Sequence, residues 1–132
     1  MTLLPLINAA MPIPHHAAAA VLAALVGAAQ LWLTKGTVLH RWLGYIWTSL
    51  IGFVALTGFF IFETGVAPPF NYLSKPLSAL VLVMLWRGIR LARADKIKEH
   101  RQTMIQLFWL TMLIGLLTMQ PGRIMHQMLK SA

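Results

Sequence analysis

The stretch RGIRLARADKIKEHR, residues 87–101, holds six of the eleven Lys and Arg residues in this 132-residue chain. A shorter basic cluster consists of Lys35 and Arg41. Around these clusters the chain carries no Asp, Glu, Lys or Arg over three long runs, which are residues 1–34, 42–62 and 102–122. A charge near the centre of a bilayer costs about 2.5–3.5 kcal/mol, so charge-free runs of about 20 residues are typical of membrane spans.

The composition agrees with a membrane protein, because 58% of the residues are hydrophobic and 11% are charged. A soluble domain of this size would expose too much apolar surface. Cysteine is absent, which excludes a disulfide or a thiolate metal site. The net charge is +8, and most of the basic residues lie beside the predicted spans, where membrane topology and anionic lipids account for them. We therefore expect membrane lipids and no nucleic acid as partners.

We predict an all-α, integral membrane, up-down-up-down four-helix bundle, because short connections favour antiparallel neighbours. Residues 1–14, which contain three prolines, are expected to form an interfacial N-terminal arm, and residues 15–132 the four-helix transmembrane domain. Pro76 suits the first turn of the third helix, and Pro121-Gly122 ends the fourth. The predicted spans cover about 15–34, 42–62, 76–94 and 102–120.

The direction of the spans follows from the basic clusters. Four spans place both clusters on one side of the membrane, and cytoplasmic loops carry an excess of Lys and Arg. Both termini are then expected on the outer side.

A stripe of small residues on the second predicted helix indicates close helix packing. Gly44, Thr48 and Gly52 follow one another at four-residue spacing. Small residues at this spacing allow the backbones of two membrane helices to approach. We therefore expect this stripe to face a neighbouring helix.

Two His-Arg pairs are the main candidates for a ligand site, at the entrances of the second and fourth predicted helices. These helices are diagonal partners that enter from one face, so His40 and His100 are expected at one level, where they could bind haem b or a quinone. Haem iron takes axial histidine ligands, and Arg41, Arg87 and Arg101 could neutralise haem propionates. Both rings lie close to the headgroups, however, so membrane anchoring or contact with another subunit is the favoured interpretation, with no cofactor bound.

Other residues give little support for chemistry. His15, His16 and His126 form a second group on the outer side, but adjacent His15 and His16 point about 100° apart on a helix, and no metal site is expected there. The sequence has no catalytic triad, no pair of carboxylates and no phosphate-binding loop, so we do not expect an enzyme.

The order of these features resembles a family. A histidine that opens the first span, the stretch 39–45 with its His40-Arg41 pair, Trp86, and the pair His100-Arg101 ahead of Met104 are similar to the bacterial predicted-membrane-protein family of unknown function 2306. The resemblance covers about residues 15–124 and implies a protein of the bacterial inner membrane, with both termini then on the periplasmic side.

Two functions remain open. The favoured expectation is a small non-catalytic accessory or assembly subunit of a larger bacterial membrane redox or photosynthetic complex, packed against other transmembrane subunits. The alternative is a small b-type cytochrome or quinone-binding membrane protein that uses His40 and His100.

Overall fold

The computed structural model describes residues 4, 13–60, 70–117 and 130 of the chain, and the two long segments contain four helices. Most of the expected N-terminal arm, the loop after the second helix and the proline that was expected to end the fourth helix lie outside the described residues. The helices are α2 (Ile13–Trp32), α3 (Val38–Phe60), α4 (Phe70–Arg93) and α5 (Ile97–Leu117).

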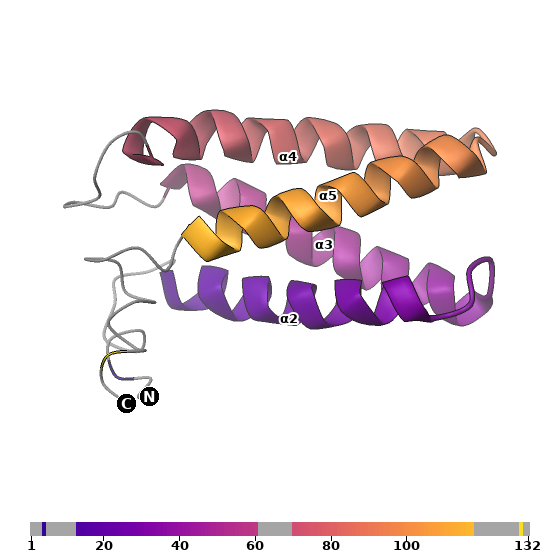
Figure 1. Cartoon of the computed structure of the whole chain (residues 1–132), viewed down its shortest axis with the longest axis horizontal. Helices are drawn as coiled ribbons and strands as arrows, with labels where there is room; N and C mark the ends of the chain where they lie inside the picture. The colour runs from indigo at the N-terminus through magenta and orange to yellow at the C-terminus, as the bar shows by residue number, and fades with distance from the viewer. Residues whose placement is uncertain (1–3, 5–12, 61–69, 118–129, 131–132) are drawn as a thin grey trace.

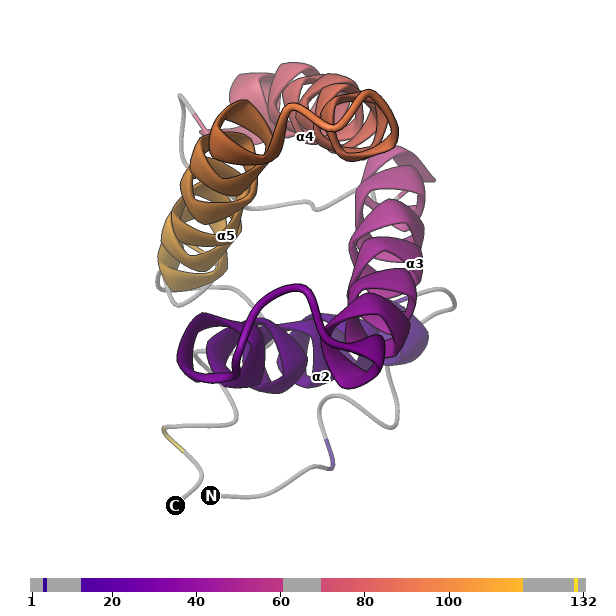
Figure 2. The ribbon, with the colours of Figure 1, turned by 90° about the vertical axis from the view of Figure 1, so that its right-hand side faces the viewer.

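The four helices run antiparallel to their sequence neighbours, and the α2–α3 and α4–α5 turns lie at the same end of the molecule (Figure 1). Seen from that end, the order around the ring is α2, α3, α4 and α5, so that α3 and α5 face each other diagonally (Figure 2). Contacts are extensive between consecutive helices and sparse between α2 and α5. The predicted all-α, up-down-up-down bundle is therefore confirmed.

The helix boundaries differ from the predicted ones most clearly at α4. This helix begins at Phe70 and contains Pro76 in its interior, so the prediction that Pro76 lies in the first turn was wrong. The residues from Phe70 to Lys75 include no glycine and no further proline, so nothing in them breaks a helix. Pro76 removes one backbone hydrogen bond inside α4 and does not mark its start.

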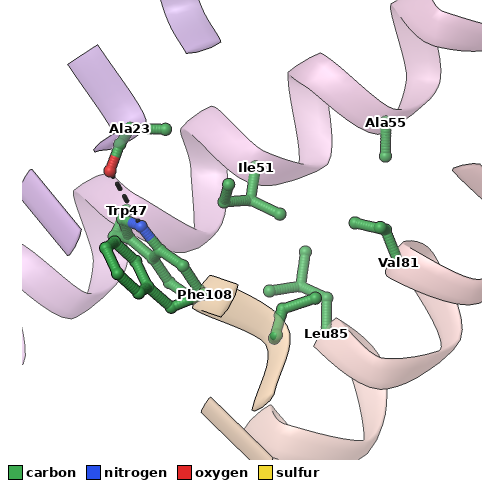
Figure 3. Packing of buried hydrophobic residues seen from close by; sticks show 8 residues of the cluster. Ala23, Trp47, Ile51, Ala55, Val81, Leu85 and Phe108 are labelled. Carbon is green, nitrogen blue, oxygen red and sulfur yellow. Dashed lines mark hydrogen bonds between the residues drawn. The ribbon is translucent and has the colours of Figure 1, made fainter. Parts of the chain in front are cut away.

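The core lies between the helices and is centred on Trp47 of α3 (Figure 3). The Trp47 Nε1–H group donates a hydrogen bond of 3.0 Å to the carbonyl oxygen of Ala23 on α2. The Phe108 ring of α5 lies beside the Trp47 indole, and Leu107 is fully buried, with 0% of its surface exposed. One tryptophan thus connects three helices and has its polar atom satisfied.

The outer faces of the helices carry large apolar side chains. Leu25, Val83, Trp109 and Leu116 are each at least 60% exposed. Within the described residues, the stretches Pro14–Trp32 and Val38–Phe59 are long and apolar enough to cross a membrane, and only 17% of each is buried inside the bundle. Such helices are exposed to their surroundings, unlike the core helix of a soluble protein, and a bilayer is the medium that suits them.

The closest helix approaches occur at glycines outside the predicted stripe. A Cβ atom at Gly27 would lie 2.6 Å from Trp47 Nε1, and one at Gly58 would lie 2.7 Å from Ser78 Oγ. In the predicted stripe, Gly44 faces Gln30 of α2 and Gly52 faces Leu85 of α4. Eight residues turn a helix by about 80° beyond two full turns, so this stripe passes from one neighbour to the next and forms no single seam.

Candidate ligand site at the basic end

Lys35 and Thr37 fix the α2–α3 turn at the basic end. The Lys35 ammonium donates to the carbonyl oxygens of Leu31 and Leu33, at 2.8 and 2.9 Å, and so caps the end of α2. Gly36 takes a φ of 79°, which favours glycine. Thr37 is the N-cap of α3, because its hydroxyl oxygen accepts from the backbone N–H of His40 at 3.1 Å.

The α4–α5 turn has the geometry of a Schellman motif. The Lys96 N–H donates to the Leu91 carbonyl oxygen at 3.0 Å, and the Asp95 N–H donates to that of Ala92 at 3.2 Å. Asp95 takes a φ of 57° at the position where glycine is usual. The turn between the helices therefore uses only the three residues 94–96, and α5 begins at Ile97.

His40 and His100 both lie within the first turn of their helices. The predicted spans begin after them, near residues 42 and 102, whereas the cap at Thr37 and the tight turn at Asp95 start the helices at Val38 and Ile97. Both histidines are half-buried. They lie on the diagonal pair of helices, each in the first turn after one of the two connections that share an end of the bundle. The structure thus places them at one level of the bundle.

The His100 ring is oriented by α4. Its Nδ1 lies 2.8 Å from the carbonyl oxygen of Gly88. A carbonyl oxygen only accepts, so Nδ1 carries the proton and, in the neutral ring, Nε2 keeps its lone pair. The ring approaches α4 at a residue without a side chain, and a Cβ at Gly88 would run into Met104 of α5. A histidine held through Nδ1 in this way presents Nε2 as an acceptor or a ligand.

Gln30 of α2 is a member of the site that the sequence analysis missed. Its Nε2 donates to the backbone carbonyl oxygen of His40 at 3.0 Å. Gln30 Oε1 and His40 Nδ1 are both buried and have no hydrogen-bond partner. A lone amide inside an otherwise charge-free apolar run was the signal that could have identified it.

The three arginines proposed for the site have exposed side chains. Arg41, Arg87 and Arg101 are exposed and lie around the basic end, on α3, α4 and α5. Arg90, one turn beyond Trp86 on α4, places its guanidinium carbon 4.9 Å from the centre of that indole ring. The arginines therefore lie at the surface of the end that holds the histidine pair.

His15 and His16, at the start of α2, have different environments. His15 is exposed, whereas His16 is half-buried with its Nδ1 2.7 Å from Thr57 Oγ1 on α3. The Thr57 hydroxyl donates to the Phe53 carbonyl oxygen at 2.8 Å, so its oxygen accepts from the His16 N–H. His126 lies outside the described residues, within which no group of three or more metal-ligating side chains occurs.

Four packed helices with apolar outer faces define an α-helical membrane protein. The chain belongs to the predicted membrane protein family DUF2306, which it matches over residues 13–129. This match confirms the family resemblance of the sequence. No curated protein and no solved structure matches the chain.

Proposed function

We propose that this protein binds a quinone headgroup between Gln30, His40 and His100. The observation that carries the proposal is the pair of buried atoms without a partner, Gln30 Oε1 and His40 Nδ1. An unsatisfied buried polar atom costs about 1–3 kcal/mol, so a ligand that satisfies both would be stabilised. A quinone oxygen accepts from a ring N–H but cannot donate to an amide oxygen. The hydroxyl of the reduced form can do both, so the quinol is the form that satisfies Gln30 Oε1 as well as His40 Nδ1.

The depth of the site also favours a quinone over haem b. Haem b, the alternative ligand, would take Nε2 of His40 and of His100 as axial ligands and would leave Gln30 Oε1 without a partner. Both histidines lie in the first turn of a helix at the basic end, a level that suits a polar headgroup with its apolar tail between the helices. A quinol thus accounts for the buried Gln30 Oε1, which haem would leave without a partner.

Binding without turnover suits a subunit of a larger complex. Within the four described helices, Glu99 of α5 is the one acidic residue, and its side chain is exposed. The apolar outer faces of the helices can pack against other transmembrane helices. These features support a non-catalytic accessory or assembly subunit of a membrane redox or photosynthetic complex, in which this bundle holds a quinone.

Binding can be tested with the purified full chain and a short-chain benzoquinol kept in the reduced form, because only the quinol hydroxyl can donate to Gln30 Oε1. We expect Gln30→Leu and His40→Leu each to weaken binding about tenfold, which corresponds to the loss of one hydrogen bond of about 1.4 kcal/mol. His15→Leu, at an exposed histidine, is the matched control and should change the affinity less than twofold. Equal affinities in all variants would refute the site. If the wild-type chain showed a Soret band and His40→Ala did not, the ligand would be haem and not a quinone.

The accessory role predicts a large assembly. After gentle solubilisation, the protein should migrate with other membrane proteins at a mass well above that of the 14.7 kDa chain. Migration alone as a monomer or homodimer under every mild condition would contradict this role.

We further propose that the basic end faces the cytoplasm and both termini face the periplasm. A cysteine at Gly36 or Lys96 should be protected from an impermeant thiol reagent in intact cells, and one at Val66 should be labelled. Labelling of both turns from outside would reverse the orientation.

A further inference from the structure

The outward face of α4 changes from apolar to cationic along its length. Ala79 and Val83 are exposed in the middle of the helix, followed by Trp86, Arg90 and Arg93 towards the basic end, and we call these five residues the α4 stripe. At 100° per residue these positions share one side of the helix. The buried residues Val81, Leu85 and Gly88 lie on the opposite side. The α4 stripe therefore faces away from the bundle.

Arg90 is held in place at the centre of the charged part. Its guanidinium lies over the Trp86 ring, 4.9 Å from the ring centre, so the cation is positioned at the level of the indole. Tryptophan side chains of membrane proteins prefer the interface between acyl chains and headgroups. The interaction thus places a fixed positive charge at headgroup depth.

The surrounding charges add to this field. Residues 87–101 contain six basic and two acidic residues, and Arg93 lies one turn beyond Arg90 on the same face. Seven residues of α-helix separate Val83 from Arg90, which corresponds to about 10 Å along the axis. An apolar surface followed over this distance by two guanidinium groups is complementary to an acyl chain followed by a phosphate.

We propose that the α4 stripe binds an anionic glycerophospholipid of the bilayer, with the phosphate at Arg90 and Arg93 and an acyl chain along Val83 and Ala79. This site is independent of the proposed quinone site, because Gln30, His40 and His100 lie inside the bundle end and the α4 stripe lies on its outer surface. The lipid would be held by position and charge together.

The test compares two double variants that remove the same charge. Arg90→Gln/Arg93→Gln removes the phosphate contacts of the α4 stripe, and Lys96→Gln/Lys98→Gln removes two exposed cations of the neighbouring turn. Native mass spectrometry of the full chain, purified with phosphatidylglycerol and phosphatidylcholine in equal amounts, measures which lipid is retained. Circular dichroism checks that both variants keep their helices.

We expect the wild-type chain to retain phosphatidylglycerol preferentially. Removal of both stripe arginines should reduce that preference about 30-fold, at about fivefold per cation, and the lysine variant should lose less than threefold. Arg90→Lys should retain less lipid than the wild type, because lysine keeps the charge but loses the planar contact with the indole. An equal loss in both double variants would show only general attraction to the basic end and would overturn the proposal. So would the absence of any preference in the wild type.

Discussion

The middle of the bundle and its basic end both bury polar side-chain atoms, but these atoms differ in whether they have a hydrogen-bond partner. In the middle, the Trp47 N–H reaches the Ala23 carbonyl and the surrounding residues are apolar and closely packed. At the basic end, Gln30 and His40 each bury a polar atom that has no partner. The same three helices meet at both levels, so the contrast arises from the side chains and not from the helix arrangement.

This contrast distinguishes a level of the bundle that stabilises the fold from a level that could accommodate a ligand. A satisfied polar group in an apolar core stabilises a single packing arrangement, whereas an unsatisfied one lowers stability unless a ligand completes it. The middle therefore holds the helices together, and the basic end is the region where a ligand would add stability. Substitutions in the middle should consequently lower the stability of the ligand-free protein, and removal of an unsatisfied group at the basic end should raise it.

The largest effect is expected at Gly27. A Cβ at this position would lie 2.6 Å from Trp47 Nε1 and 2.7 Å from the Phe108 ring, so Gly27→Ala must displace both aromatic side chains. We expect a loss of about 2–3 kcal/mol, measured by thermal unfolding in detergent. Gly115→Ala is the matched control, because a Cβ there meets nothing within 4 Å. Equal melting temperatures of the two variants would show that the middle is not closely packed.

Trp47→Phe should have the next largest effect. It keeps an aromatic ring in the core but removes the N–H donor to the Ala23 carbonyl oxygen. The expected loss is about 1 kcal/mol. The exposed tryptophan Trp109 provides the control, and Trp109→Phe should leave the melting temperature unchanged.

At the basic end, Gln30→Leu should stabilise the ligand-free protein by up to about 1 kcal/mol. The change removes the unsatisfied Oε1 and fills the same space with apolar atoms. It also removes the Nε2 bond to the His40 carbonyl oxygen, which lies in α3 and keeps its helical acceptor role. The same variant is expected to bind benzoquinol less tightly, so stability and affinity should move in opposite directions. A destabilised Gln30→Leu variant would show that Gln30 stabilises the ligand-free protein, as the polar contact of Trp47 does in the middle, and would contradict the contrast.

The smallest effect is expected at the α4–α5 turn. Asp95→Gly should stabilise the protein by about 0.5 kcal/mol, because glycine takes a φ of 57° without the steric conflict of a Cβ. Asp95→Ala should destabilise it, since alanine has no short polar side chain to bond locally. The two variants differ by a single carbon, and opposite shifts of their melting temperatures would confirm the left-handed conformation.

The fold could be predicted from the sequence because a membrane excludes charged residues from whole spans and leaves them in the connecting turns. Runs without charge and basic turns determine the number of helices and their antiparallel order, whatever the details of packing. The boundaries could not be predicted to the same degree. The early start of α4 before Pro76 depends on the absence of any breaker between Phe70 and Lys75, and the early start of α5 depends on the turn geometry at Asp95.

The candidate site was predictable only in part, for a similar reason. His40 and His100 share a level because the two turns share an end, which the charge pattern already indicates. The contact of Gln30 with the His40 backbone and of His100 with Gly88 depends on helix rotation, which the apolar pattern leaves undefined when nearly every face is hydrophobic. The exposure of the three arginines follows from the same rotation.

The most extensive contacts, α2 with α3 and α4 with α5, join helices that follow each other directly in the chain. Each pair is closed by a short turn that its own residues stabilise, Lys35 and Thr37 in one and Asp95 in the other. Local contacts form early because little chain entropy is lost in making them. The chain is thus suited to enter the membrane during synthesis as two successive hairpins, with the docking of α3 on α4 as the later step of assembly.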